Sequence, residues 1–224
     1  MRTIELSADQ QRWLLLPPTF PTAEGESAQQ WEDRVVDGMR EAWRGTLTSE
    51  VEPHVRAALR FGCSKILPED SVTLQFWPAA NIANVVVHIG ADETVESDLS
   101  VPPLDTSLDY VTKPIVTPFE AERLGTGVEV RHVRLAENTD PPLALAGVNY
   151  RFASSTGEIV VVAEPTFPAL LGLMLEPLRE VVRSMWVSSD DSSAGWVRST
   201  IDVSAFSGGT DEWQLDDAVG EEAR

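Results

Sequence analysis

"GVNYRFASSTGEIVVV" (Gly147–Val162) decides the fold of this chain, because it has the pattern of a β-hairpin. Val148, Tyr150 and Phe152 alternate with polar neighbours, which is the period of a strand with one buried face. A turn over Ser154–Gly157 follows, and then a second apolar run. Strands joined by so short a turn pair antiparallel, so the sequence predicts a mainly antiparallel sheet.

Besides a short strand at the start of the chain, three further strands are predicted between Val72 and Leu135. Alternation over Val72–Trp77 predicts a half-buried strand, and "NVVVHIG" (Asn84–Gly90) predicts a more fully buried one. In "GVEVRHVRL" (Gly127–Leu135) the apolar side chains change face part-way along the segment. That change predicts a β-bulge near Arg131 and His132.

Two amphipathic helices are predicted in the N-terminal third. Ser27 and Gln30 have the spacing of a capping box, and apolar residues then recur every four positions until Gly45 ends the helix. A second helix is expected from Ser49 to Gly62, with Glu52 at its capping-box position.

A closing helix is predicted in "PTFPALLGLMLEPLREVVRSMW" (Pro165–Trp186), which has a wide apolar face. Pro177 lies inside it and lacks the N–H that the carbonyl of Leu173 would accept, so we expect a kink or a short break there. Together these patterns predict an α+β fold, with a mainly antiparallel sheet packed with amphipathic helices and a proline-kinked closing helix.

The composition changes near residue 188. Residues 1–187 are predicted to form a single α+β domain, whereas residues 188–224, rich in Ser, Gly and acidic residues, are predicted to be an acidic tail that is disordered or loosely docked. The tail carries three spaced aromatic residues, Trp196, Phe206 and Trp213. They are the candidate partner-binding residues, because an acidic segment with spaced aromatics can fold onto a groove of another protein.

Charge and cysteine content limit the class of protein. With 36 acidic and 17 basic residues the net charge is -19, which disfavours nucleic-acid binding and is compatible with a basic protein partner. The single cysteine, Cys63, excludes an intramolecular disulfide and a multi-cysteine zinc site. No apolar stretch reaches about 18 residues and no signal-peptide pattern is visible, so we expect a cytoplasmic protein with no membrane span.

A cysteine nucleophile with a histidine base would have to use Cys63 and His54. The two are nine residues apart around one predicted helix and carry no family signature, so Cys63 is expected to be a small buried hydrophobic residue. The sequence predicts no catalytic residue and no cofactor.

His88 and His132 are the candidates for a metal site, because both fall on predicted strands. If those strands are neighbours, the imidazoles could meet beside a carboxylate such as Glu129 or Asp92. No short ligand spacing supports this, and the favoured interpretation is two structural histidines, one hydrogen-bonded and one exposed. No metal ligand is therefore assigned.

The order of elements is carried by three segments: "WLLLPPTFP" (Trp13–Pro21), "GVNYRFASSTGEIVVVAEPTF" (Gly147–Phe167) and "ALLGLMLEPLREVVRSMW" (Ala169–Trp186). A strand ended by prolines and a helix precede an antiparallel sheet with a late hairpin and a closing helix. This order resembles the PsbP-like α/β/α sandwich superfamily, including the DcrB-type bacterial proteins. The resemblance implies a non-catalytic assembly factor, adaptor or chaperone, and it supplies no catalytic residue.

Three functions are compatible with these observations. The first is a non-catalytic protein-binding protein, such as a cytoplasmic chaperone or adaptor for bacterial secretion or envelope assembly. The second is a small-molecule-binding protein or an enzyme without a recognisable motif, with a pocket between the sheet and the closing helix. A deep pocket lined by polar groups, especially His88 with His132, would favour it. The third is an immunity-type inhibitor whose acidic surface covers a basic toxin.

Overall fold

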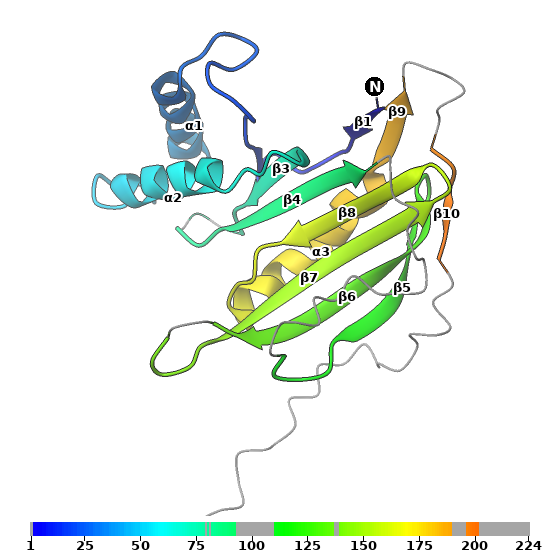
Figure 1. Ribbon diagram of the computed structural model, residues 1–224. Coiled ribbons are helices and arrows are strands. Elements are labelled where there is room, and N and C mark those ends of the chain that lie inside the picture. Colours follow the sequence, from blue (N-terminus) through cyan, green and yellow to red (C-terminus); the bar gives the residue numbers. More distant parts are fainter. Residues whose placement is uncertain are drawn as a thin grey trace, which may run out of the picture.

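The computed structural model describes residues 2–78, 80, 82–92, 110–136, 139–189 and 196–201, and it confirms the α+β fold class (Figure 1). Helices and strands in these ranges follow the order β1 (Arg2–Glu5), β2 (Trp13–Leu15), α1 (Ala28–Ala42), α2 (Glu52–Ser64), β3 (Asp70–Phe76), β4 (Val85–Asp92), β5 (Ile115–Ala121), β6 (Gly125–Leu135), β7 (Ala144–Ser154), β8 (Gly157–Ala163), α3 (Pro168–Ser184), β9 (Trp186–Ser189) and β10 (Ser199–Thr200).

The main sheet has the strand order β10-β6-β7-β8-β4-β3-β2, with β5 paired to β6. Its pairings are antiparallel apart from that of β10 with β6. The predicted hairpin is confirmed as β7 and β8, whose register runs from Ser154 opposite Gly157 to Asn149 opposite Val162. A separate two-stranded ribbon joins β1 to β9, so the two ends of the domain lie together.

Helix α3 covers one face of the main sheet (Figure 1). Its residues Met174, Leu178 and Val182 are fully buried and belong to the same apolar cluster as the inward side chains of β3, β4, β7 and β8. Pro177 lies inside the helix, which continues without a break to Ser184. The side chain of Leu173 is 61% exposed, so solvent is close to the carbonyl that the proline leaves without its helical donor.

Helices α1 and α2 pack on each other beside β3 (Figure 1) and enclose a second apolar cluster. The capping box of α1 is confirmed, because Ser27 and Gln30 exchange both hydrogen bonds. The predicted start of α2 at Ser49 is wrong: the helix begins at Glu52, after an N-cap at Val51 that has no side-chain cap.

The two faces of β3 are both covered at one end of the strand, contrary to the half-buried prediction. The Gln75 amide donates to the carbonyl of Ala58 in α2 at 2.9 Å, and Gln75 is fully buried. Sequence alternation could not predict this, because the second cover comes from a helix rather than from the strand itself.

The predicted bulge in β6 is wrong. The pairing of β6 with β7 keeps one register from Val128 to Leu135. The apolar side chains change face because both faces of the strand are buried: Val128 and Val130 pack with Ile201 on one side, whereas Val133 packs against the α3 cluster on the other.

Part of the predicted acidic tail lies on the main sheet. The Trp196 indole N–H donates to the carbonyl of Leu124 at 3.1 Å. The Ser199 hydroxyl donates to the carbonyl of Thr126 at 2.6 Å and accepts from the N–H of Ala153 at 3.1 Å. These bonds hold β10 at the point where β6 begins and β7 ends.

No helix within the described ranges is long and apolar enough to cross a membrane.

Candidate functional site

The face of the main sheet opposite α3 carries a cavity of about 480 Å³ over β4, β8, β7 and β6. Because side chains alternate along a strand, the residues that point here are those between the inward residues of the α3 cluster. We call this cavity the histidine pocket, and its polar lining residues are Glu69, Asp70, His88, Tyr110, His132, Arg134, Asn149 and Glu164.

The strand register explains how distant residues share this pocket. His88 of β4 lies opposite Val162 of β8, which lies opposite Asn149 of β7. Two residues before Asn149 on β7, Gly147 lies opposite His132 of β6. A Cβ at position 147 would stand 2.6 Å from the imidazole Nε2 of His132, so this glycine leaves the room that the ring occupies.

Asp70 fixes the orientation of His88 at one end of the pocket. Its Oδ2 lies 2.7 Å from the imidazole Nδ1 of His88 and also accepts from the N–H of Leu67 and the hydroxyl of Thr73. Because this oxygen already accepts from two donors, it favours a proton on Nδ1 of His88 as the third. The other imidazole nitrogen, Nε2, is buried and has no hydrogen-bond partner.

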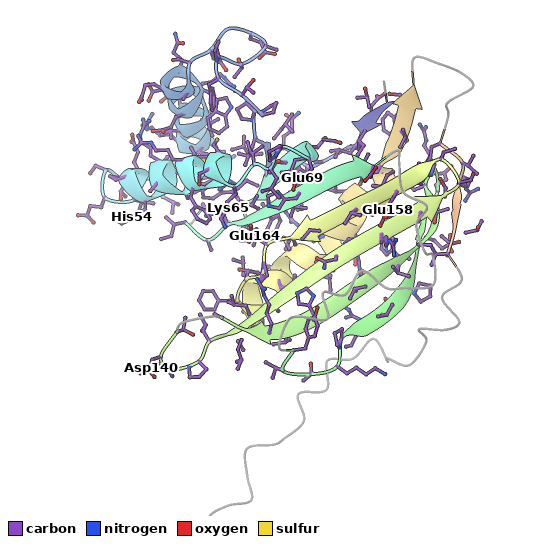
Figure 2. All side chains as sticks on the ribbon, in the orientation of Figure 1. His54, Lys65, Glu69, Asp140, Glu158 and Glu164 are labelled. Carbon is purple, nitrogen blue, oxygen red and sulfur yellow. The ribbon has the colours of Figure 1, made fainter. Side chains whose placement is uncertain are left out.

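A second carboxylate, Glu164, lies 3.6 Å from Nε2 of His88, and Lys65 lies 3.4 Å from Glu164 (Figure 2). Glu164, and also Asp70, raise the pKa of His88 above its ordinary value, although burial opposes them. In turn the His88 imidazole lowers the pKa of Glu164. The carboxylates at the His88 end of the pocket therefore stabilise the protonated, positively charged form of the His88 imidazole.

The opposite end of the pocket has the reverse electrostatics. His132 is 6% exposed, contacts the edge of the Tyr110 ring at a centroid distance of 5.6 Å, and leaves its Nδ1 without a hydrogen-bond partner. Burial lowers the pKa of His132, and the positive charge of Arg134 lowers it further. Arg134 is half-buried, and no carboxylate in the described part of the chain forms an ion pair with it.

A second hollow, of about 460 Å³, lies where α3 meets β5 and β6, and we call it the α3 cleft. Its central group is Glu129, which is 1% exposed and accepts two bonds from the Arg179 guanidinium, at 2.8 and 2.7 Å. Arg131 lies 3.2 Å from the same carboxylate. At the rim, Arg183 pairs with Glu176. The charges of this cleft therefore neutralise one another.

The predicted histidine pair does line one pocket, but the metal interpretation fails. Strands β4 and β6 are separated by β8 and β7, so His88 and His132 cannot share an ion. Glu129 lies on the other face beside Arg179, and no group of three possible ligands exists among the described residues. Asp92, the other carboxylate considered, is exposed at the end of β4. The expectation of one exposed histidine is wrong, because both are buried.

His54 and Cys63 do not form a catalytic pair. Both lie on α2, where nine residues of helical rise separate them by about 13 Å. Burial raises the pKa of the Cys63 thiol, which disfavours the reactive thiolate. Cys63 is only half-buried, so the expectation of a buried residue is wrong.

Six polar pocket residues were not predicted from the sequence: Glu69, Asp70, Tyr110, Arg134, Asn149 and Glu164. Asp70 begins β3, Glu164 directly follows β8, and Asn149 lies within the largely apolar β7, so each is a polar residue inside or directly beside an apolar strand. That signal was present, but the pairing that brings them together depends on a register that one sequence does not reveal.

Comparison with known protein families, with curated proteins and with solved structures finds no match to this chain. The resemblance to the PsbP-like superfamily accordingly stays a prediction from element order. What the pocket binds has to be inferred from its own side chains.

Proposed function

We propose that this protein binds a small organic molecule in the histidine pocket. The observation that carries the proposal is a set of three buried polar atoms without hydrogen-bond partners, Nε2 of His88, Nδ1 of His132 and Oδ1 of Asn149, whose residues all line this cavity. Each such atom costs on the order of 1–3 kcal/mol when it stays unpaired. A bound molecule that supplies the partners removes that cost.

The size and lining of the cavity support a small ligand. Its volume of about 480 Å³ falls in the range of small-molecule sites, roughly 300–1,000 Å³. Val160, Val162 and Ala163 of β8 form an apolar floor, and the polar groups stand at the ends. An apolar body with a few placed hydrogen-bonding groups is the usual complement of such a site.

The α3 cleft has a similar volume but supports this function less well. Its buried carboxylate, Glu129, already has a bidentate partner in Arg179. A ligand there would have to displace a charged pair, whereas three residues that line the histidine pocket carry a polar atom without a hydrogen-bond partner. We therefore propose the small-molecule site on the face opposite α3 rather than in the space between the sheet and the closing helix.

A ligand screen by saturation-transfer NMR on the full chain tests this function. Val162→Phe places a larger side chain on the floor of the pocket, where Val162 is half-buried. It should abolish the binding of the fragments that bind the wild-type protein. Ile82→Phe is the matched control, because Ile82 is 50% exposed and does not line the pocket. If Val162→Phe retains the same hits as wild type while folding normally, the pocket is not the binding site.

The protein-binding role stays a prediction of the sequence, as do the inhibitor role and the cytoplasmic location. Three residues were candidates for binding a protein partner. One of them, Trp196, is half-buried against the main sheet, and its indole N–H donates to the carbonyl of Leu124. Phe206 and Trp213 lie outside the described residues.

A further inference from the structure

Resting on the proposed function, we propose the class of molecule that fills the histidine pocket: an elongated organic anion with a carboxylate at the Arg134 end and a neutral hydroxyl at the His88 end. The proposal depends on the unequal charge of the two ends, on the gap between His88 and Glu164, and on the distance that the strand register sets between the ends.

The Arg134 end favours an anion. The chain carries 36 acidic residues, yet none in its described part pairs with Arg134. The other arginine on this face of the sheet, Arg151, is held by Glu158 of the neighbouring strand. A planar guanidinium in a half-buried position is the side chain best suited to bind a carboxylate through two parallel hydrogen bonds.

The His88 end disfavours an anion and favours a hydroxyl. Glu69, Asp70 and Glu164 line this end, so a further negative charge on the ligand would be repelled there. Nε2 of His88 and Oε1 of Glu164 are 3.6 Å apart, too far for a direct hydrogen bond. A hydroxyl placed beside both can accept a hydrogen bond from the Nε2–H of the protonated imidazole and donate its own O–H to the carboxylate.

The strand order sets the length of the ligand. From β4 to β6 the sheet makes three strand steps, through β8 and β7. At about 4.8 Å a step these strands are roughly 14 Å apart. Arg134 also lies four residues, roughly 13 Å, further along β6 than Val130, which shares the row of His88, so the two Cα atoms are roughly 19 Å apart. The two side chains reach inward from both ends and shorten the distance that the ligand has to span. A molecule with about 8–10 Å between its two polar groups fits this span, with its apolar body on Val160 and Val162 and with Asn149 beside it.

Three matched probes test the class by isothermal titration calorimetry with the full chain. They are 4-hydroxycinnamate, its methyl ester and cinnamate. The first has both polar groups, the second lacks the negative charge, and the third lacks the hydroxyl. We expect 4-hydroxycinnamate to bind, and each of the other two to bind about tenfold more weakly, because each loses one hydrogen-bonded group, charged in the case of the ester.

Arg134→Met should weaken the binding of 4-hydroxycinnamate about tenfold and leave the binding of the methyl ester unchanged. Arg198→Met removes the same charge from an exposed position outside the pocket and is the control that should change neither. In NMR spectra, the ring signals of His88 and His132 should shift on binding, whereas those of His54 on α2 should not.

Two failures are distinguishable. If the ester binds as well as the acid, if Arg134→Met has no effect, or if none of the three binds at millimolar concentration, the ligand class is wrong. The proposed function still stands in that case, provided that fragments of another class lose binding in Val162→Phe. If no fragment depends on the pocket, the proposed function fails as well.

Discussion

The histidine pocket and the α3 cleft are hollows of nearly equal volume on opposite faces of one sheet, about 480 and 460 Å³. In the cleft, the buried carboxylate of Glu129 meets the guanidinium of Arg179, which α3 supplies. In the pocket, polar atoms of His88, His132 and Asn149 stay unpaired. Volume alone does not distinguish a binding site from a packing defect; the state of the hydrogen bonds that line it does.

The difference implies that the two faces have separate tasks. The α3 face should respond to substitution mainly through the stability of the fold, because its apolar and charged groups are committed to one another. The pocket face should respond mainly through binding and through the titration of its histidines. Substitutions on each face test this division.

The largest effect is expected on the α3 face from Leu178→Ala. Leu178 is fully buried against the sheet, and the cavity left behind should lower the free energy of unfolding by about 3 kcal/mol. Leu173→Ala on the same helix is the control: its side chain is 61% exposed, so the change should stay within about 0.5 kcal/mol. Urea unfolding followed by circular dichroism measures both. Equal losses would mean that α3 does not pack as described.

A smaller loss, about 2 kcal/mol, is expected from Arg179→Met. The substitution leaves Glu129 buried with Arg131 as its remaining cation, and the cost is limited because Arg179 is itself 21% exposed. Arg183→Met breaks a pair with Glu176 in which both side chains are about half exposed, and should cost under about 1 kcal/mol. The order of the two losses, measured by urea unfolding, is the test; if Arg183→Met costs more, the cleft is not held by its buried pair.

On the pocket face, Gly147→Ala should lower the free energy of unfolding by about 1 kcal/mol and displace the His132 ring. The added Cβ would stand 2.6 Å from Nε2 of His132, closer than any real contact allows. Gly172→Ala is the matched control, because a Cβ at that position of α3 meets nothing within 4 Å. A glycine-to-alanine change inside a helix stabilises by up to about 1 kcal/mol, so the two variants should shift the thermal midpoint in opposite directions.

A loss of binding in Gly147→Ala, without loss in Gly172→Ala, would place the ligand beside His132. If Gly147→Ala is as stable as wild type and the His132 ring signals do not move, the close approach of β6 and β7 at this point is not as described.

How much of the structure could be predicted depends on how far apart in the sequence the interacting residues lie. The β7–β8 hairpin was predictable because its turn and alternation are local in sequence, and the capping box of α1 was predictable for the same reason. The site was only half predictable. His88 and His132 stood out as polar residues in apolar strands, but Asp70 pairs with His88 through the register of β3 and β4, which lies beyond any local pattern.

The two wrong predictions about β3 and β6 share one cause, the burial of both faces of a strand. In β6 a change of apolar face suggested a bulge, although the register with β7 is unbroken. In β3 the alternation of apolar and polar residues predicts an exposed Gln75. Helix α2 buries this side chain instead, and a carbonyl of that helix accepts its amide hydrogen bond. When helices or a returning segment cover the second face, alternation no longer reports on exposure.

The smallest and most specific expected effect is a difference in sign between the two histidines of the pocket. The pKa of His88 is raised by Glu164 and Asp70, so its contribution to stability is complete below the ordinary histidine value of 6.5 and is lost as the pH rises through the folded value. The pKa of His132 is lowered by burial and by Arg134, so its contribution is present above 6.5 and is lost as the pH falls.

His88→Gln should therefore flatten the alkaline side of the stability profile measured by urea unfolding between about pH 5 and 8, and His132→Gln the acidic side. His54→Gln on α2 should leave both sides as in wild type, since His54 does not line the pocket. If the two pocket variants flatten the same side, the two ends do not carry opposite charge, and the polarity on which the ligand class rests is lost.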